Sequence, residues 1–169
     1  MIPIDRGGGT ASEQAIRTGL GVLADGQVLG IYPEGTRSPD GRLYRGKTGV
    51  ARLAVESGAL VVPCAMIDTF QFQPPGTLRP NMRFRPGVRF GEPLDFSRYR
   101  GQEADGQLLR SITDEVMRAI AKLSGQEYVD IDARQAKAEL ASGGPAAPAA
   151  PGDAADTDET DTPGRNALA

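Results

Sequence analysis

The chain has 169 residues, which is enough for one hydrophobic core and short for two. It contains no histidine and a single cysteine, Cys64. These counts exclude a histidine general base, a Ser-His-Asp site, a histidine metal site, a cysteine zinc cluster and a disulfide framework within these residues. The lone cysteine favours a reducing compartment. No apolar run reaches about 18 residues, so no transmembrane helix is predicted.

The net charge of -3 is unevenly distributed along the chain. From residue 141 onward there are five acids and one base, so residues 1–140 sum to about +1. Within them, residues 33–100 hold eleven Lys or Arg against six Asp or Glu. This basic middle of the chain favours an anionic partner.

Hydrophobic periodicity and turn residues predict alternating strands and helices. In chain order we expect a short strand at 1–4, a helix at 10–24, a buried strand at 28–32, a basic loop at 42–47, a helix at 47–57, a buried strand at 60–65, one or two edge strands at 83–90, and helices at 103–123 and 132–140. The early part of this order is a βαβαβ unit, which implies a parallel sheet. We therefore predict an α/β fold, with a mostly parallel sheet flanked by helices and incomplete at the N-terminus. From residue 142 the composition collapses to Gly, Pro, Ala, Asp and Thr, which predicts a disordered C-terminal tail.

Polar residues crowd the end of the predicted buried strand at 28–32. The sequence there runs Tyr32-Pro-Glu-Gly-Thr-Arg-Ser38. Pro33 is expected to end the strand because it brings no N–H to a ladder. Gly35 can take a backbone conformation closed to other residues. In open α/β sheets, ligands bind at the carboxyl ends of strands, so this segment is a candidate site.

The side chains of this segment suit a phosphate. Arg37 supplies a guanidinium fork, while Thr36 and Ser38 add hydroxyl donors. Glu34 would repel the anion unless it faced a hydroxyl or held an arginine, which argues for a ligand with both phosphate and hydroxyl groups. The residues alone leave open a second interpretation, a tight turn whose polar groups are solvated.

Two more basic residues extend the candidate site. Arg6 follows the apolar segment at 1–4, and it would emerge beside Arg37 if that segment ran parallel to the strand at 28–32. Lys47 lies at the start of a predicted helix, where the helix dipole also attracts anions. The alternative for both is a solvated surface charge of little energetic weight.

These pieces, in this order, resemble the glycerolipid acyltransferase family, typified by PlsC-type 1-acyl-glycerol-3-phosphate acyltransferases. The family's Phe-Pro-Glu-Gly-Thr-Arg-Ser block is matched by residues 32–38, with only Phe changed to Tyr. Its apolar strand ending in arginine is matched by residues 2–6, and its Val-Pro-Val strand by Val62-Pro63-Cys64. The resemblance covers about residues 1–130, which we expect to be a partial acyltransferase domain, followed by a polar helical extension at 131–141 and the tail at 142–169.

The resemblance implies an O-acyltransferase of phospholipid biosynthesis that needs no cofactor and no metal. An acyl group would pass from acyl-CoA or acyl carrier protein to the free hydroxyl of 1-acyl-glycerol 3-phosphate. The resemblance assigns Arg6 and Arg37 to the phosphate and Val62 and Pro63 to the acyl-donor side. The residues that would shape the phosphate pocket are Glu34, Gly35 and Thr36, to which Ser38 and Lys47 are added from their chemistry.

The family's His-x4-Asp block has no counterpart in these residues. In the family its histidine is the general base on the acceptor hydroxyl. We expect a late start or a fragment, or else a degenerate homologue, and in each case a chain that does not catalyse acyl transfer by the family mechanism. The alternative function is a non-catalytic binder of anionic lipid or phosphate.

The expected partners follow from the lipid substrates. They are the acyl donor, lysophosphatidate or a related glycerol phosphate, and the membrane surface, with the protein peripheral at its cytoplasmic, inner face. Nucleic-acid binding through the arginines of residues 79–100 is not expected, because no recognised motif is present. Phe84 and Phe90 in that stretch are expected to be core residues of strands.

Overall fold

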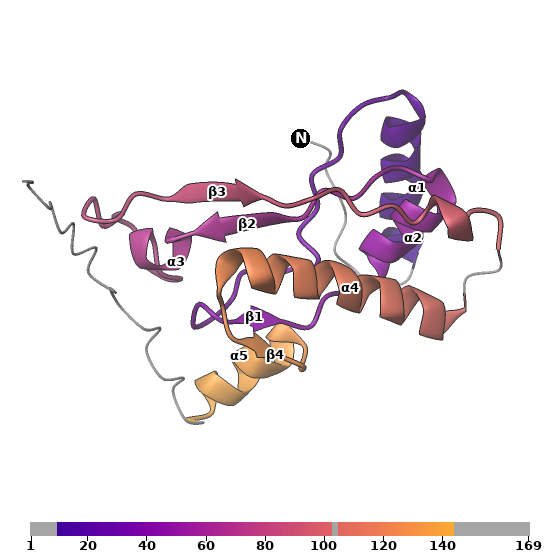
Figure 1. Ribbon diagram of the computed structural model, residues 1–169. Coiled ribbons are helices and arrows are strands. Elements are labelled where there is room, and N and C mark those ends of the chain that lie inside the picture. The colour runs from indigo at the N-terminus through magenta and orange to yellow at the C-terminus, as the bar shows by residue number, and fades with distance from the viewer. Residues whose placement is uncertain (1–9, 103–104, 144–169) are drawn as a thin grey trace, which may run out of the picture.

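The computed structural model describes residues 10–102 and 105–143. Its helices are α1 (Thr10–Ala24), α2 (Gly49–Ser57), α3 (Thr69–Phe72), the 3-10 helix η1 (Ser97–Tyr99), α4 (Gly106–Ser124) and α5 (Ala133–Ala141). Its strands are β1 (Leu43–Tyr44), β2 (Cys64–Ile67), β3 (Gly87–Phe90) and β4 (Tyr128–Val129). Figure 1 shows α4 between the pair of strands β2 and β3 on one side and β1 with β4 on the other, with α1 and α2 at one end. No helix among the described residues is long and apolar enough to cross a membrane.

The longer helices confirm the predictions from hydrophobic periodicity. α1 has the predicted bounds, and α2, α4 and α5 lie within a few residues of theirs. Gly58 and Gly125 stop α2 and α4 with φ of 71° and 69°, a conformation that glycine adopts without strain. Asp105 and Asp132 cap the starts of α4 and α5 with carboxylates that accept backbone N–H groups.

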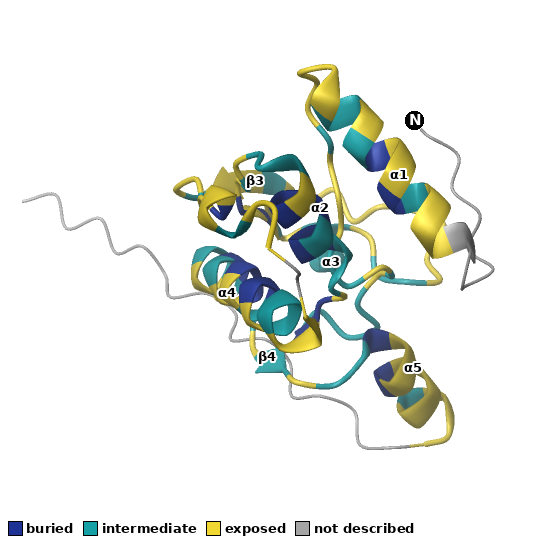
Figure 2. Cartoon of the chain, turned by 90° about the vertical axis from the view of Figure 1, so that its right-hand side faces the viewer, coloured by how far each residue is buried: buried dark blue, intermediate teal, exposed yellow. Residues whose placement is uncertain are grey.

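The hydrophobic core lies chiefly between α2 and α4. Figure 2 shows dark-blue buried bands on both helices. The apolar residues of each helix recur at helical spacing, so they lie on one side of the helix, and that side faces the core. The buried cluster consists of Leu43, Val50, Ala51, Ala54, Val55, Phe96, Ile112, Val116, Met117 and Ile120.

The α/β class with parallel pairing is confirmed, although the parallel strands are ones that the sequence did not predict. β1 pairs with β4, with Leu43 opposite Tyr128 and Tyr44 opposite Val129. β1 lies inside the predicted basic loop at 42–47, and that prediction is wrong at these two residues. A two-residue strand is too short to show the period of two by which strands are recognised.

The prediction of a buried strand at 28–32 is wrong. This stretch pairs with no strand among the described residues, and Val28, Ile31 and Tyr32 are all exposed. An apolar run becomes a buried strand only where neighbouring strands bond to it and other elements cover both its faces. The neighbour predicted for it, at residues 1–4, lies outside the described residues, and so does Arg6. The predicted βαβαβ unit is therefore not seen in the described part of the chain.

The prediction of a buried strand at 60–65 is correct only in part, because the strand lies at Cys64–Ile67 as β2 and Ala65 is its only buried residue. β2 pairs antiparallel with β3, one of the predicted edge strands, with Cys64 opposite Phe90 and Met66 opposite Val88. Upstream of β2, a single bridge joins Val61 to Leu94. We call β2 and β3 together the β2–β3 ribbon.

The ribbon is covered on one face only. Ala65 is buried, whereas Phe90 is 71% exposed and Phe84, just before β3, is 38% exposed. The prediction that both phenylalanines are core residues is therefore wrong. Alternate side chains of a strand point to opposite faces, and a ribbon with a single covering layer leaves one of those faces open.

The chain after β1 passes close to α4 at Gly46. A Cβ at this buried position would lie 2.8 Å from Met117 Sδ and 3.1 Å from Thr113 Cγ2. We expect Gly46→Ala to lower the free energy of unfolding by about 1–2 kcal/mol, because the packed side chains have to shift.

Gly21→Ala in α1 is the matched control for this substitution. Nothing lies within 4 Å of an added Cβ at Gly21. The free energy of unfolding should therefore rise by about 0.5–1 kcal/mol, since alanine favours the helix. Urea unfolding of both variants checks the pair, and an unchanged midpoint for Gly46→Ala would contradict the close packing on α4.

Candidate functional site

The candidate segment Tyr32–Ser38 forms a turn between α1 and β1. The Gly35 N–H donates to the Tyr32 carbonyl at 3.0 Å, and the Lys47 N–H donates to the Pro33 carbonyl at 2.8 Å. Gly35 has a φ of 69°. This is a backbone conformation closed to most other residues, as the sequence predicts for this glycine. A Cβ there would also come within 3.1 Å of Lys47 Cε. Glycine is therefore needed both for the backbone conformation and for the close approach of Lys47.

Glu34 fastens this turn to β1. One oxygen of its carboxylate accepts the Tyr44 backbone N–H at 2.6 Å. Burial raises the pKa of Glu34, the Tyr44 hydrogen bond opposes that rise, and the negative charge of Asp40 adds to it. The sequence left two roles open for Glu34, facing a hydroxyl or holding an arginine. In the structure the carboxylate instead bonds to the backbone of a neighbouring strand.

A polar cluster around Asp40 continues the turn, and sequence reasoning missed it. Asp40 accepts hydrogen bonds from the Tyr44 hydroxyl at 2.8 Å, from Arg42 Nε at 2.9 Å and from the Ser38 hydroxyl at 3.3 Å. The Ser38 hydroxyl in turn accepts the Gly41 N–H at 3.0 Å. The sequence signal was Ser-Pro-Asp-Gly, which indicates a turn but does not indicate the tyrosine that closes it.

The electrostatics of this cluster favour a charged Asp40. Burial alone would raise the pKa of Asp40, but hydrogen bonds from Tyr44 and Arg42, with the charge of Arg42, lower it overall. Burial and the bond to Asp40 raise the pKa of Tyr44 to about 12, so its phenol stays protonated and donates. The segment from Ser38 to Tyr44 is thus a unit bonded together by hydrogen bonds. It supports the Tyr32–Ser38 turn, because the Tyr44 N–H bonds to Glu34.

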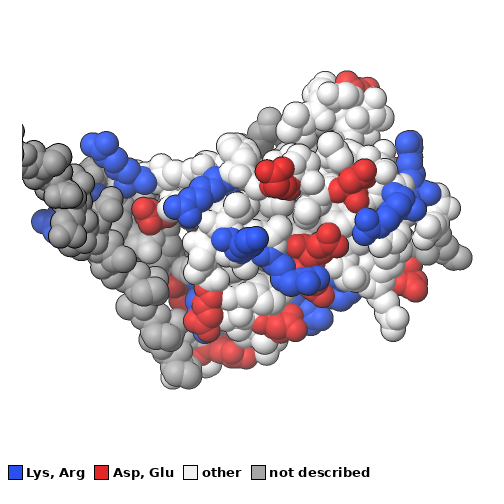
Figure 3. Space-filling view, in the orientation of Figure 1, with Lys and Arg blue, Asp and Glu red and all other residues white. Residues whose placement is uncertain are grey.

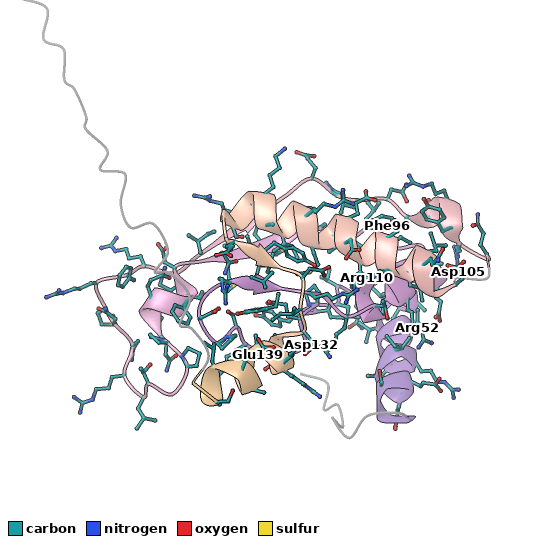
Figure 4. All side chains as sticks on the ribbon, turned by 90° about the horizontal axis from the view of Figure 1, so that it is seen from below. Arg52, Phe96, Asp105, Arg110, Asp132 and Glu139 are labelled. Atoms are coloured by element: carbon teal, nitrogen blue, oxygen red, sulfur yellow. The ribbon has the colours of Figure 1, made fainter. Side chains whose placement is uncertain are left out.

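Lys47 is held by an ion pair. Its Nζ lies 3.0 Å from Asp132 Oδ2, at the start of α5, where Figure 4 labels Asp132. The Arg134 backbone N–H and the Lys47 ammonium both lower the pKa of Asp132. The structure therefore brings Lys47 beside Gly35, as the candidate site requires, and also anchors it to α5.

The remaining predicted residues differ in their surroundings. Arg37 is exposed, and among the described residues its guanidinium has no hydrogen-bond or ion-pair partner, while Thr36 is half-buried. Val62 and Pro63 lie just before β2, with Val62 exposed and Pro63 buried. The structure thus gathers the residues of one loop and its neighbour, which are Glu34, Gly35, Thr36, Arg37, Ser38 and Lys47.

Comparisons with known proteins give this site a family context. The Acyltransferase family model matches residues 1–67. A chloroplastic 1-acyl-sn-glycerol-3-phosphate acyltransferase of Arabidopsis thaliana is 31% identical over 77 residues, covering 46% of this chain and 22% of the relative. A 1-acyl-sn-glycerol-3-phosphate acyltransferase of Limnanthes alba is 37% identical over 79 residues, covering 46% of this chain and 28% of the relative.

A solved structure is similar over a longer stretch. It is the 1-acyl-sn-glycerophosphate acyltransferase PlsC of Thermotoga maritima, with a TM-score of 0.50 and 29% identity, covering 65% of this chain and 44% of that one. The matched part of the chain is therefore similar to acyltransferase domains. More narrowly, it is similar to part of the PlsC-type glycerolipid acyltransferases. The chain spans about a quarter of the length of the curated relatives it matches.

Proposed function

We propose that the chain supplies the glycerol-phosphate-binding half of a 1-acyl-glycerol-3-phosphate acyltransferase of phospholipid biosynthesis. The observation that carries this proposal is the Tyr32–Ser38 turn. Glu34 fastens it to β1, Gly35 gives it its shape, and its Arg37 is exposed, with a guanidinium that has no hydrogen-bond or ion-pair partner among the described residues. A rigid loop that presents an exposed arginine suits the two-oxygen geometry of a phosphate.

The reaction that this site would serve is the transfer of an acyl group to a hydroxyl. The acceptor is lysophosphatidate, whose phosphate is bound by Arg37 with Arg6 as its expected partner. Its free hydroxyl attacks the thioester carbonyl of acyl-CoA or acyl carrier protein, the carbon–sulfur bond breaks, and the thiol leaves. The hydroxyl proton needs a base, which in the family is a histidine. The sequence contains no histidine, so we propose that this chain binds the acceptor without turning it over.

The place of action follows from the substrates. We propose that the protein works as a peripheral protein at the cytoplasmic face of the membrane, because its proposed acceptor and product are lipids. The basic middle of the chain supports this location, since anionic lipids attract such segments.

Two measurements on the purified chain test the proposal. Titration calorimetry with lysophosphatidate should show binding that weakens as salt rises, because the phosphate contact is electrostatic. Release of CoA from acyl-CoA in the presence of lysophosphatidate should stay at the background rate. Absent lysophosphatidate binding would refute the acceptor site, and CoA release at the rate of a complete relative would refute the claim that this chain is inactive alone.

The absence of histidine also favours the second candidate, a non-catalytic binder of anionic lipid or phosphate. The two candidates differ in what the chain recognises besides the phosphate. The acyltransferase half should bind lysophosphatidate better than diacylated phosphatidate, which lacks the free hydroxyl. A simple phosphate binder should treat the two lipids alike, and competition calorimetry separates these outcomes.

A further inference from the structure

The far end of the β2–β3 ribbon carries arginines and exposed apolar side chains together. After α3 the chain forms a loop at residues 73–86, which we call the tip loop. From residue 69 to 91 there is no acidic residue. In the tip loop Arg79, Arg83 and Arg85 are exposed, as are Leu78 at 95% and Met82 at 79%. Figure 3 shows blue side chains at this left-hand end of the molecule.

The tip loop has a definite conformation that holds these side chains outward. The Asn81 N–H donates to the Phe72 carbonyl at 2.7 Å, which closes the part of the loop between these two residues. Within it, Thr77 donates to Pro74 through both its N–H and its hydroxyl, and the Arg83 N–H donates to Asn81 Oδ1. Figure 4 shows the side chains of this loop projecting away from the rest of the molecule.

Further exposed apolar side chains lie on the open face of the ribbon. Val62, Met66, Val88 and Phe90 are all exposed on this ribbon or just before it. A contiguous apolar surface rimmed by charge marks an interaction site, because isolated exposed side chains are ordinary but a grouped set is not. A partner for this surface has to accommodate apolar side chains and arginines together.

A bilayer with anionic lipid satisfies both features. Leucine, methionine and phenylalanine side chains enter the boundary between headgroups and acyl chains, while arginine stems follow them and leave the guanidinium groups at the phosphates. Each basic residue near an anionic surface adds attraction that salt screens. Arg89 does not belong to the arginines that would contact the bilayer, because its Nη1 donates to the Leu123 carbonyl near the end of α4.

The tip loop is also connected to the candidate site. It follows α3 directly, and Phe70 of α3 packs over Gly41, where a Cβ would lie 3.1 Å from the Phe70 ring. Gly41 belongs to the bonded unit that supports the Tyr32–Ser38 turn. The tip loop is therefore linked through α3 to the segment that supports this turn.

We propose that the tip loop and the open face of the β2–β3 ribbon form a docking surface for bilayers that contain anionic phospholipid. Its biological reason rests on the proposed function, which needs a protein that reaches lipid substrates. The exposed side chains and the charge of this loop favour a bilayer whether or not that function holds.

Vesicle co-sedimentation of the full chain tests the docking surface. Equimolar phosphatidylglycerol and phosphatidylcholine vesicles should bind the protein, and phosphatidylcholine vesicles should bind it far less. The triple variant Arg79→Gln, Arg83→Gln, Arg85→Gln should weaken binding about tenfold or more. The double variant Leu78→Ser, Met82→Ser keeps the charge and should also weaken binding, because the apolar contact is lost.

The matched control changes three exposed basic residues elsewhere, as Arg17→Gln, Arg134→Gln, Lys137→Gln. It should bind vesicles like the unaltered chain, and thermal melts should show that all variants remain folded. Equal loss in the control, unaltered binding by the tip variants, or preference of the tip loop for single-stranded RNA over vesicles would overturn the proposal. The assay contains no acyl donor or acceptor, so its failure is separable from a failure to bind lysophosphatidate.

Discussion

Replacing Arg37 with alanine is expected to weaken lysophosphatidate binding by about tenfold to a hundredfold. The substitution removes charge-assisted hydrogen bonds to phosphate, worth roughly 1.5–3 kcal/mol. Arg37→Lys keeps the charge but loses the planar fork, so an intermediate loss is expected. Arg37 is exposed. The free energy of unfolding should therefore change by less than about 0.5 kcal/mol, and the affinity loss should reflect binding alone. Calorimetry for affinity and urea unfolding for stability check the two parts.

Arg17→Ala is the control for the Arg37 prediction. Arg17 is exposed on α1, so its removal changes the net charge equally without touching the Tyr32–Ser38 turn. Soluble glycerol 3-phosphate should serve as a second probe, because it keeps the phosphate and has no acyl chain that could bind elsewhere. Equal affinity losses for the two alanine variants would mean that the anion responds to overall charge, and the assignment of Arg37 to the phosphate would fail.

The features predicted correctly from the sequence are those that neighbouring residues determine. The 3.6-residue period of α1 and α4, the stops at Gly58 and Gly125 and the positive-φ turn at Gly35 each depend on a few adjacent positions. The phosphate-binding block at residues 32–38 can likewise be predicted from the sequence, because its polar side chains lie within seven consecutive residues.

The features that were missed depend on partners far along the chain. β1 exists because β4 pairs with it, and Glu34 bonds to a backbone N–H ten positions later. The run at 28–32 shows the reverse error, since apolar composition predicts burial only if covering elements are present, and Val28 is 96% exposed. Phe90 was misjudged for the same reason, because periodicity does not reveal that one face of a ribbon lacks a covering layer.

Asp40→Ala is expected to lower the free energy of unfolding by about 3 kcal/mol. The carboxylate accepts hydrogen bonds from Ser38, Arg42 and Tyr44, and the Tyr44 side chain is fully buried. Alanine would leave the tyrosine hydroxyl without an acceptor in the protein interior. The turn that carries Arg37 would lose the hydrogen-bonded segment that supports it, so lysophosphatidate binding should weaken as well. Urea unfolding measures the first effect and calorimetry the second.

Asp40→Asn separates the charge from the hydrogen bonds of Asp40. The amide oxygen still accepts from Tyr44, so the loss should be only about 1 kcal/mol at neutral pH. The pKa of Asp40 is lowered from 3.8, which means that its charged form stabilises the fold above that pH and that this stabilisation is lost as the pH falls through the lowered pKa. The stability difference between the unaltered chain and Asp40→Asn should therefore vanish in acid. Asp25→Ala, at an exposed position after α1, is the control and should be nearly neutral. A difference that persisted in acid would show that the charge of Asp40 is not what stabilises the turn.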